Sequence, residues 1–289
     1  MPVFPAIDRN CHMMHLHARL SFQYPRVIAP LTLAVLVLGT LHGTAQAQAF
    51  DAVRLTGGPP GQSGGTVGAA VVAGQAYRGS DESRVRLYPG VDYQWANGWF
   101  AGTTNGIGVN LSRQPAMQYG ARVTVDLGRK ERRSAALRGM GDVDVRPELG
   151  AFFNLVPTPG VTLTSSLRFG SGVDRDGWVI DLGANRSWRI TETTSLGVGV
   201  SATWANANYQ QSYFGVTPAQ AITSGYAPYR ADAGVRDVRL SASWRYRIAP
   251  RTALAASVSV SSLRGDARSS PLTRERSPVS GVFFVAHAF

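Results

Sequence analysis

The chain has 289 residues, of which 44% are apolar and only 16% charged, and it contains 32 glycines. So little charge excludes a disordered polyelectrolyte, because disordered segments combine many charges with few apolar residues. The formal charge of +11 comes from 29 basic and 18 acidic residues. An excess of this kind is compatible with nucleic acid, an anionic membrane surface or acidic ligands, and the arrangement of the charges along the chain must decide among them.

The beginning of the chain predicts a secretory signal peptide. An uncharged apolar run covers 27–41, which is shorter than the roughly 20 residues that a membrane-spanning helix needs. Arg19 and Arg26 precede the run, and Ala45 and Ala47 follow it in the small-x-small spacing of a cleavage site. We therefore expect cleavage after Ala47.

Removal of residues 1–47 would narrow the chemistry that the protein can perform. Cys11 is the only cysteine, and His287 is the only histidine outside this leader. A secreted chain without disulfides must be stabilised by a large hydrogen-bonded core or by a membrane. The long stretch ahead of the apolar run leaves Met13 and Met14 open as alternative starts.

Alternation of apolar and polar residues runs through the rest of the chain. In 117–127 the odd positions are apolar or aromatic and the even ones include Gln118, Arg122 and Asp126, and this period of two is typical of strands with two different faces. We predict eleven such strands, near 66–78, 84–96, 99–111, 117–127, 144–156, 161–170, 177–188, 194–206, 235–248, 252–264 and 278–289.

Strand length and loop pattern indicate an all-β transmembrane antiparallel β-barrel. The segments are about 10 residues long, as tilted membrane strands are, whereas strands of soluble proteins average about 5–6 residues. Short turns near 97–98, 157–160 and 249–252 alternate with longer polar loops. In outer-membrane barrels such turns face the periplasm and such loops face outward. The longer loops cover 128–144, 207–233 and 264–277.

A soluble sandwich is the alternative fold. It would have shorter strands and bulkier inner faces.

Eleven strands cannot be the final number, because bacterial single-chain barrels carry an even number. We expect twelve, with Phe50–Leu55 supplying the missing strand, or ten if an early glycine-rich segment is misassigned. The expected organisation is a signal peptide (1–47), an N-terminal periplasmic segment (48–64) and an outer-membrane β-barrel (65–289).

The last strand carries an assembly signal of a kind common among barrels. Phe283, Val285 and the terminal Phe289 share one apolar face with His287. Many outer-membrane barrels end in such an apolar strand with a terminal aromatic, which the barrel assembly machinery recognises.

The opposite faces of the strands carry charges of both signs. These residues would form an ion-pair network in a narrow lumen, because the guanidinium fork of arginine binds carboxylates in a two-pronged manner. Their cationic excess leaves open a small passive pore that prefers anions. The residues are Arg86, Asp92, Arg122, Asp126, Arg146, Glu148, Arg168, Asp181, Arg239, Arg245 and Arg247.

Several short motifs, in order along the chain, resemble those of the MipA/OmpV family of Gram-negative outer-membrane proteins. The resemblance extends from about residue 65 to the end of the chain. The motifs lie at Tyr77–Asp81, Val91–Tyr93, Gly106–Leu111, Leu137–Asp142, Tyr213–Ala219 and Leu263–Ala267 with Ser270-Pro271.

This resemblance implies a non-enzymatic scaffold in the cell outer membrane. The named family member holds a murein synthase and a lytic transglycosylase together, so the resemblance implies these two enzymes as partners. Other members are known as surface antigens.

The residues themselves argue against catalysis, cofactors and nucleic acid. Barrel hydrolases use a histidine as base or orienter, and His287 lies on the apolar face of the last strand. With one histidine and no cysteine beyond the leader we expect neither a transition-metal site nor a cofactor. The basic residues are interleaved strand by strand, and the one basic run (Arg129, Lys130, Arg132 and Arg133) is predicted to be a solvated loop tip or a contact for lipopolysaccharide.

Overall fold

The segments with a period of two fold as strands. The computed structural model describes residues 61–289, so the predicted signal peptide and Phe50–Leu55 lie outside the described residues. The strands are β1 (Gly64–Gln75), β2 (Ser83–Gln94), β3 (Trp99–Gly102), β4 (Gly106–Asn110), β5 (Met117–Asp126), β6 (Arg146–Thr158), β7 (Val161–Ser171), β8 (Gly177–Arg189), β9 (Thr194–Ala205), β10 (Gly234–Ala249), β11 (Thr252–Leu263) and β12 (Val279–Ala288).

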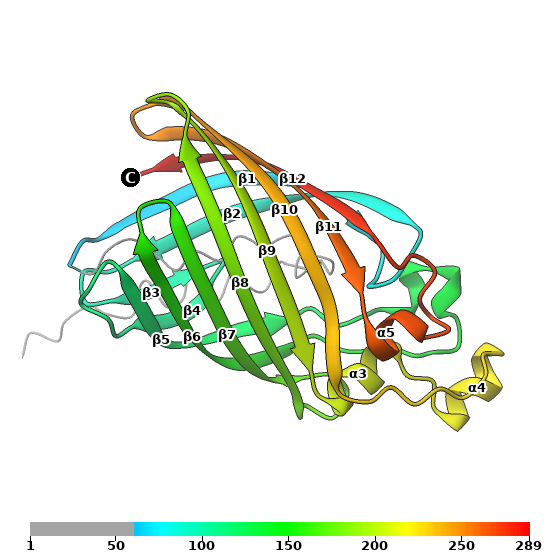
Figure 1. Cartoon of the computed structure of the whole chain (residues 1–289). Coiled ribbons are helices and arrows are strands. Elements are labelled where there is room, and N and C mark those ends of the chain that lie inside the picture. Colours follow the sequence, from blue (N-terminus) through cyan, green and yellow to red (C-terminus); the bar gives the residue numbers. More distant parts are fainter. Residues whose placement is uncertain (1–60) are drawn as a thin grey trace, which may run out of the picture.

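The twelve strands close into one antiparallel barrel (Figure 1). Each strand pairs with its neighbours in the sequence, and β1 pairs with β12 from Thr66↔Ala288 to Ala73↔Gly281. This confirms the predicted all-β antiparallel barrel and its twelve strands. Closure leaves no open sheet edge along this seam, which is the condition for a sheet to stand in hydrocarbon.

The twelfth strand does not come from the segment expected to supply it. The predicted strand 99–111 is a hairpin of two short strands, β3 and β4, whose tip lies at 103–105. Asn105-Gly106 is a strong hairpin signal, and Gly106 has a φ of +76°, which the left-handed region of such a turn requires. Apolar–polar alternation continues on both sides of this turn, so the two short strands look like one strand in the sequence.

The barrel has two unlike ends. At one end, which we call the turn end, short connections join β2 to β3, β6 to β7, β8 to β9 and β10 to β11. β1 begins and β12 ends at this same end. At the other end, which we call the loop end, the long loops gather and carry all three labelled helices (Figure 1).

The long loops are folded rather than irregular. They contain α3 (Ala207–Phe214), α4 (Pro218–Ser224), α5 (Gly265–Ser269) and the short 3-10 turns η1 (Glu131–Arg133) and η2 (Ala135–Leu137). Helix α4 begins with a capping box between Thr217 and Gln220 and a proline in its first turn, both of which favour helix initiation. Within residues 61–289 no helix has the length and apolarity needed to cross a membrane.

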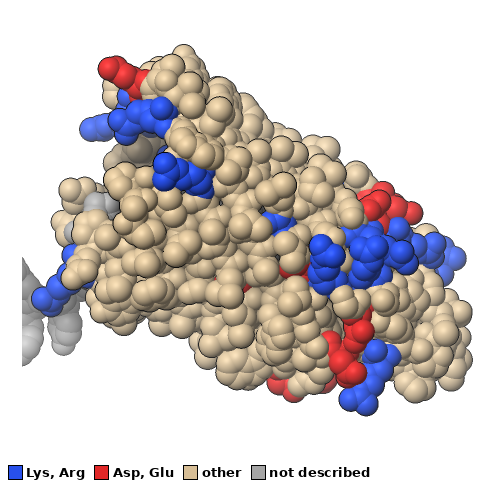
Figure 2. All heavy atoms as spheres, viewed as in Figure 1, with Lys and Arg blue, Asp and Glu red and all other residues tan. Residues whose placement is uncertain are grey.

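The outer wall of the barrel is apolar. Leu87, Leu149, Leu240 and Phe283 all point outward and are exposed. Figure 2 shows a broad uncharged belt around the visible face, with Lys, Arg, Asp and Glu gathered mainly towards the two ends. Trp178 and Trp204 lie exposed where β8 begins and β9 ends, at the loop end, which is the position expected of an interfacial aromatic girdle.

The closing seam generates a prediction at two glycines of β1. A Cβ added at Gly68 would lie 2.0 Å from the carbonyl oxygen of Val285, whereas one added at Gly74 would meet only Ser280 Cβ at 3.9 Å. We expect Gly68→Ala to destabilise the barrel by about 1–3 kcal/mol, because the two backbones must separate. Gly74→Ala should stay within about 0.5 kcal/mol.

The measurement is the urea midpoint of the detergent-purified barrel, together with its shift in electrophoretic mobility on boiling. Equal midpoints for the two variants would contradict a tight β1–β12 approach at Gly68.

Candidate functional site

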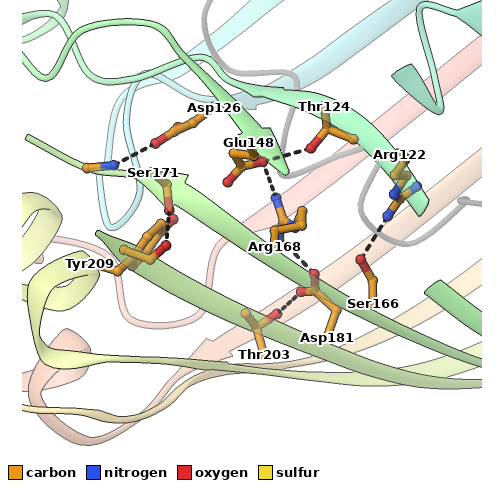
Figure 3. Close-up of polar contacts among 12 residues, drawn as sticks. Arg122, Thr124, Asp126, Glu148, Ser166, Arg168, Ser171, Asp181, Thr203 and Tyr209 are labelled. Carbon is orange, nitrogen blue, oxygen red and sulfur yellow. Dashed lines mark hydrogen bonds and ion pairs between the residues drawn. The ribbon is translucent and has the colours of Figure 1, made fainter. Parts of the chain in front are cut away.

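A buried ion-pair cluster occupies the loop-end half of the lumen (Figure 3). Arg168 of β7 lies between two carboxylates, with Nη1 3.2 Å from Glu148 Oε2 and Nη2 2.8 Å from Asp181 Oδ2. Thr124 and Thr203 donate hydroxyl hydrogen bonds to the same two carboxylates at 3.0 and 2.9 Å. Five consecutive strands are thereby tied together across their inner faces, which fits the network expected for a narrow barrel.

Arg122 of β5 lies beside this cluster and makes a hydroxyl and an aromatic contact. It donates to Ser166 Oγ at 2.8 Å and its guanidinium lies 5.9 Å from the ring centre of Phe152. An arginine can be stabilised over an aromatic face as well as by an acid. The alternation predicts that Arg122 points inward, but the aromatic partner is visible only in the fold.

Asp126 anchors a helix in the mouth of the barrel. The Tyr213 hydroxyl of α3 donates to both carboxylate oxygens of Asp126 at 2.6 Å, and the backbone amides of Gly128 and Gly172 donate to the same group. Burial is the main reason that the pKa of Tyr213 lies well above its ordinary value, and the negative charge of Asp126 acts in the same direction. The hydroxyl therefore stays a donor, and α3 is fixed across the opening.

A second buried cluster was missed from the sequence. Arg236 and Asp237 both point inward because β10 has a register shift against β9 between Val235 and Asp237. Arg236 Nε lies 2.6 Å from Asp237 Oδ2, and Asp237 Oδ1 is 3.9 Å from Arg239. A β-bulge places consecutive side chains on one face, so strict alternation misassigns Arg236. The adjacent pair of opposite charges between two valines was the available signal.

The remaining predicted lumen residues do not join one network. Asp92 accepts from Thr104 Oγ1 at 2.8 Å, Arg146 lies 3.9 Å from Asp144, and Arg247 donates to the Glu192 carbonyl at 2.7 Å. Arg245 is exposed and Arg86 is half-buried. The lumen charges thus separate into clusters at different heights.

The long loops interlock into one structure over the loop end, which we call the cap (residues 76–82, 127–145, 206–233 and 264–278). The Tyr77 hydroxyl donates to the Leu272 carbonyl at 2.9 Å, Ser270 to that of Phe214 at 2.6 Å, and Tyr226 to that of Ala136 at 3.0 Å. Apolar side chains complete the cap. They include Val143, Tyr209, Phe214, Leu263 and Ala267 in one cluster and Met140, Val216 and Leu272 in another.

Two glycines of the motifs noted in the sequence hold the cap together. Gly79 and Gly139 have φ values of +84° and +79°, a region that residues with a Cβ rarely adopt. Backbone amides of Arg274 and Glu275 donate to the Gly79 carbonyl, and a Cβ on Gly139 would lie 2.4 Å from the Thr223 carbonyl oxygen. Motifs far apart in the sequence therefore meet in the cap.

The basic run is not the solvated tip predicted for it. Arg129 is buried and donates to the Tyr213 carbonyl at 2.9 Å. Arg133 is also buried, and of the three arginines only Arg132 is exposed. Lys130, the only lysine of the chain, pairs with Asp142 at 3.1 Å and Asp144 at 2.8 Å. The hydrogen bond from Lys130 lowers the pKa of Asp144, and the backbone amide of Glu131, followed by Lys130, lowers that of Asp142. The basic run is therefore part of the folded cap, because the buried side chains of Arg129 and Arg133 hold its backbone on both sides of Lys130.

The turn-end half of the lumen holds an open cavity of about 310 Å³, which we call the vestibule. Along β10 the inward side chains pass from the buried Arg239 near the loop end to the exposed Ser243, Arg245 and Arg247 near the turn end. The lumen is thus filled under the cap and open towards the turn end. The wall of the vestibule carries hydroxyl and amide groups beside apolar side chains, including Thr162, Thr164, Asn185, Ser201, Ser243 and Ser257.

The outward residues of the last strand lie exposed on the barrel wall. Phe283, Val285 and Phe289 are exposed on the outer face, and the Phe289 ring stacks on Tyr93 with centroids 6.1 Å apart. His287 is exposed at the turn end and exchanges a hydrogen bond of 3.0 Å with Thr252. Within residues 61–289 no group of three or more His, Cys, Asp or Glu side chains could hold a metal ion.

Residues 67–289 match the family model described as MltA-interacting protein MipA. The chain belongs to this family. The match covers every strand except the first few residues of β1 and includes all four segments of the cap. The resemblance read from the motifs is therefore confirmed. No curated protein sequence matches the chain.

Solved structures similar to this MipA-family chain share little of its sequence. The NanC porin has a TM-score of 0.43 and 12% identity, over 76% of this chain and 98% of that chain. An outer-membrane channel from Pseudomonas putida F1 has a TM-score of 0.43 and 11% identity, over 82% and 98%. A FadL homologue from Pseudomonas aeruginosa has a TM-score of 0.36 and 12% identity, over 78% and 89%.

The buried cluster generates a prediction about Arg168. Arg168→Met should destabilise the barrel by about 3 kcal/mol, because Glu148 would remain buried without its cation. Adding Glu148→Gln to that variant should recover part of the loss. Both are measured as shifts of the urea midpoint, and no recovery in the double variant would show that the two side chains are not coupled.

Tyr77 generates a prediction about the cap. Tyr77→Phe removes the hydrogen bond to Leu272, worth about 1 kcal/mol, and should raise the rate of cleavage by endoproteinase Lys-C, for which Lys130 is the only site, by about fivefold. Tyr119→Phe, an exposed tyrosine on the outer wall, is the matched control and should leave the rate unchanged.

The same residue sets a pH dependence. Burial raises the pKa of Tyr77 from 10.0 to about 12, so the stability that its neutral hydroxyl contributes is fully present below pH 10 and is lost as pH rises through about 12. The difference in tyrosinate absorbance between the parent protein and Tyr77→Phe should titrate near pH 12. A midpoint near 10 would mean that the hydroxyl is solvated.

Proposed function

We propose that the protein is a non-enzymatic barrel of the Gram-negative outer membrane that serves as a scaffold for a murein synthase and a lytic transglycosylase. The signal peptide proposed for 1–47 would deliver the chain to the periplasm, and the segment 48–64 would precede the barrel there. Because outer-membrane barrels have short periplasmic turns and long external loops, the turn end faces the periplasm and the cap faces outward.

The unequal filling of the lumen carries this proposal. The cap and the buried clusters of Arg168 and Arg236 occupy the outer half, whereas the vestibule opens to the side where the cell wall lies. Its wall offers hydroxyls, amides and the exposed Arg245, which suit hydrogen bonding to a polar segment of another protein. Membership in a family described as MltA-interacting supports a periplasmic protein partner.

The alternative, a passive pore that prefers anions, rests on the arginine excess of the lumen. That excess is reduced by the pairing of Arg168, Arg236 and Arg239 with carboxylates, and the cap lies across the outer mouth. Planar-bilayer recording distinguishes the two functions, because a steady anion-selective conductance of the purified protein would favour the pore.

The scaffold is tested by crosslinking in intact envelopes followed by purification of the barrel. We expect a murein synthase and a lytic transglycosylase in the purified fraction. Ser243→Trp, which fills the vestibule, should reduce their capture at least about fivefold because a bulky ring blocks the polar surface.

Arg230→Glu is the matched control, because Arg230 is exposed on the cap and its ion pair among residues 61–289 is with the exposed Asp232 at 3.1 Å. Capture of neither enzyme by the parent protein after crosslinking would overturn the proposal. Equal loss in both variants would remove the assignment to the vestibule.

A further inference from the structure

The barrel wall is incomplete between β2 and β5. β2 pairs with β1 along its whole length but with β3 only at Asp92–Gln94. On the other side β4 reaches only Gly120–Val123 of β5. In the loop-end half, above the tip of the β3–β4 hairpin, the facing edges of β2 and β5 therefore have no strand between them among residues 61–289. We call this place the lateral opening.

The sequence of β2 is adapted to an unpaired edge. The Val91 carbonyl accepts from the Thr103 amide at 2.9 Å, and the Val91 N–H donates to Thr103 Oγ1 at 3.1 Å, so both backbone groups of Val91 point towards the hairpin. Alternate residues of a strand direct their backbone groups to the same side, so the backbone groups of Pro89, Leu87 and Val85 face the lateral opening. Proline has no N–H to leave unsatisfied, which is why it is confined to edges in sheets. The backbone groups of Leu87 and Val85 still need a polar partner, because each unpaired group in hydrocarbon costs several kcal/mol.

Cationic and hydroxyl groups line the inner side of this edge. Arg84, Arg86 and Tyr88 alternate with the outward residues of β2, and Arg133 reaches them from the cap, where Arg84 donates to its carbonyl. Burial, followed by the charge of Arg86, lowers the pKa of Arg133 to about 10. Two guanidinium groups are thus close enough to repel each other.

Two donors of this group are not used among the described residues. Nη1 of Arg86 and the hydroxyl of Tyr88 are buried and have no hydrogen-bond partner among residues 61–289, and Tyr88 is only 5% exposed. Glu82 of the cap accepts from Ser134 at 2.6 Å and lies 3.8 Å from Arg84. Arg86 forms no ion pair within the same residues. Unused buried donors beside crowded cations fit an anion with several acceptor oxygens.

The outer side of the same strand is apolar. Val85 and Leu87 are 71% and 72% exposed, and they flank the lateral opening at the height of the loop end. An occupant must therefore carry an anionic group for the inner side and apolar chains for the outer side. Lipids of the outer leaflet with a phosphate in the headgroup have this chemistry, whereas a free phosphate would satisfy only the inner side.

We propose that the lateral opening binds a phosphate-bearing lipid of the outer leaflet. The phosphate accepts hydrogen bonds from Arg86 and Tyr88 beside Arg133, and the acyl chains lie along Val85 and Leu87. The lipid closes the part of the wall where the polypeptide provides no strand. This site lies at the opposite end from the vestibule and does not depend on the scaffold function.

The experiment is native mass spectrometry of the purified, delipidated and heat-modifiable full-length barrel titrated with phosphatidic acid. We expect one bound lipid per barrel, and at least about tenfold weaker binding to the double variant Arg86→Gln/Tyr88→Phe, because charge-assisted hydrogen bonds are lost. Arg276→Gln removes an exposed arginine of the cap and should bind like the parent protein. Each variant is first checked for its boiling-dependent mobility shift, and Tyr88→Phe alone serves if the double variant does not fold.

Three parallel measurements can overturn the proposal. Equal binding of a diacylglycerol with the same chains would show that the phosphate is not recognised. Inorganic phosphate that binds Arg86 and Tyr88 with the same affinity as the lipid would assign the site to a soluble anion. A rapid disulfide between Leu87→Cys and Ala52→Cys would show that the N-terminal segment of this chain covers the edge instead.

Discussion

Backbone hydrogen bonding between β1 and β12, from Thr66↔Ala288 to Ala73↔Gly281, is the interaction on which the rest of the molecule depends. Each unpaired backbone group in hydrocarbon costs several kcal/mol, so the first and last strands of the sheet must pair with each other. Small residues of β1 such as Gly68 let β12 approach closely along this seam. The stacking of Phe289 on Tyr93 of β2, across β1, follows from it.

Closure also buries inward charged side chains, which then need partners inside the barrel. Inward arginines cannot reach bulk water under the cap, so they take carboxylates, hydroxyls or an aromatic ring as partners, as Arg168 and Arg122 do. Towards the turn end this constraint relaxes, since water reaches Arg245 and Arg247. One barrel thereby carries a filled half and an open half. The proposed scaffold uses the open half, and the proposed lipid site uses the filled half where its wall is incomplete.

Much of this architecture could be predicted because its signal is local. A period of two along 117–127 or 238–248 is visible in any short window, and it assigns Arg122, Arg168 and Arg239 to the lumen. Features that interrupt the apolar–polar alternation were not predicted. The turn at Asn105-Gly106 splits one expected strand, and the bulge at Arg236 turns an outward position inward. The burial of Arg129 and Arg133 depends on contacts with Tyr213 and β2 that are distant in the sequence, so no local pattern could reveal it.

The cap has a consequence for the order of folding. The hydrogen bond from Tyr77 to Leu272 joins residues 195 positions apart, and Tyr226 reaches back 90 positions to Ala136. Contacts of such large sequence separation form late, because the intervening chain must first lose its conformational freedom. We therefore expect the cap to assemble late in folding, when the strands that carry its segments have been brought together. A barrel that has not closed would therefore keep the four segments of the cap apart, and an assembled cap would indicate that closure is complete.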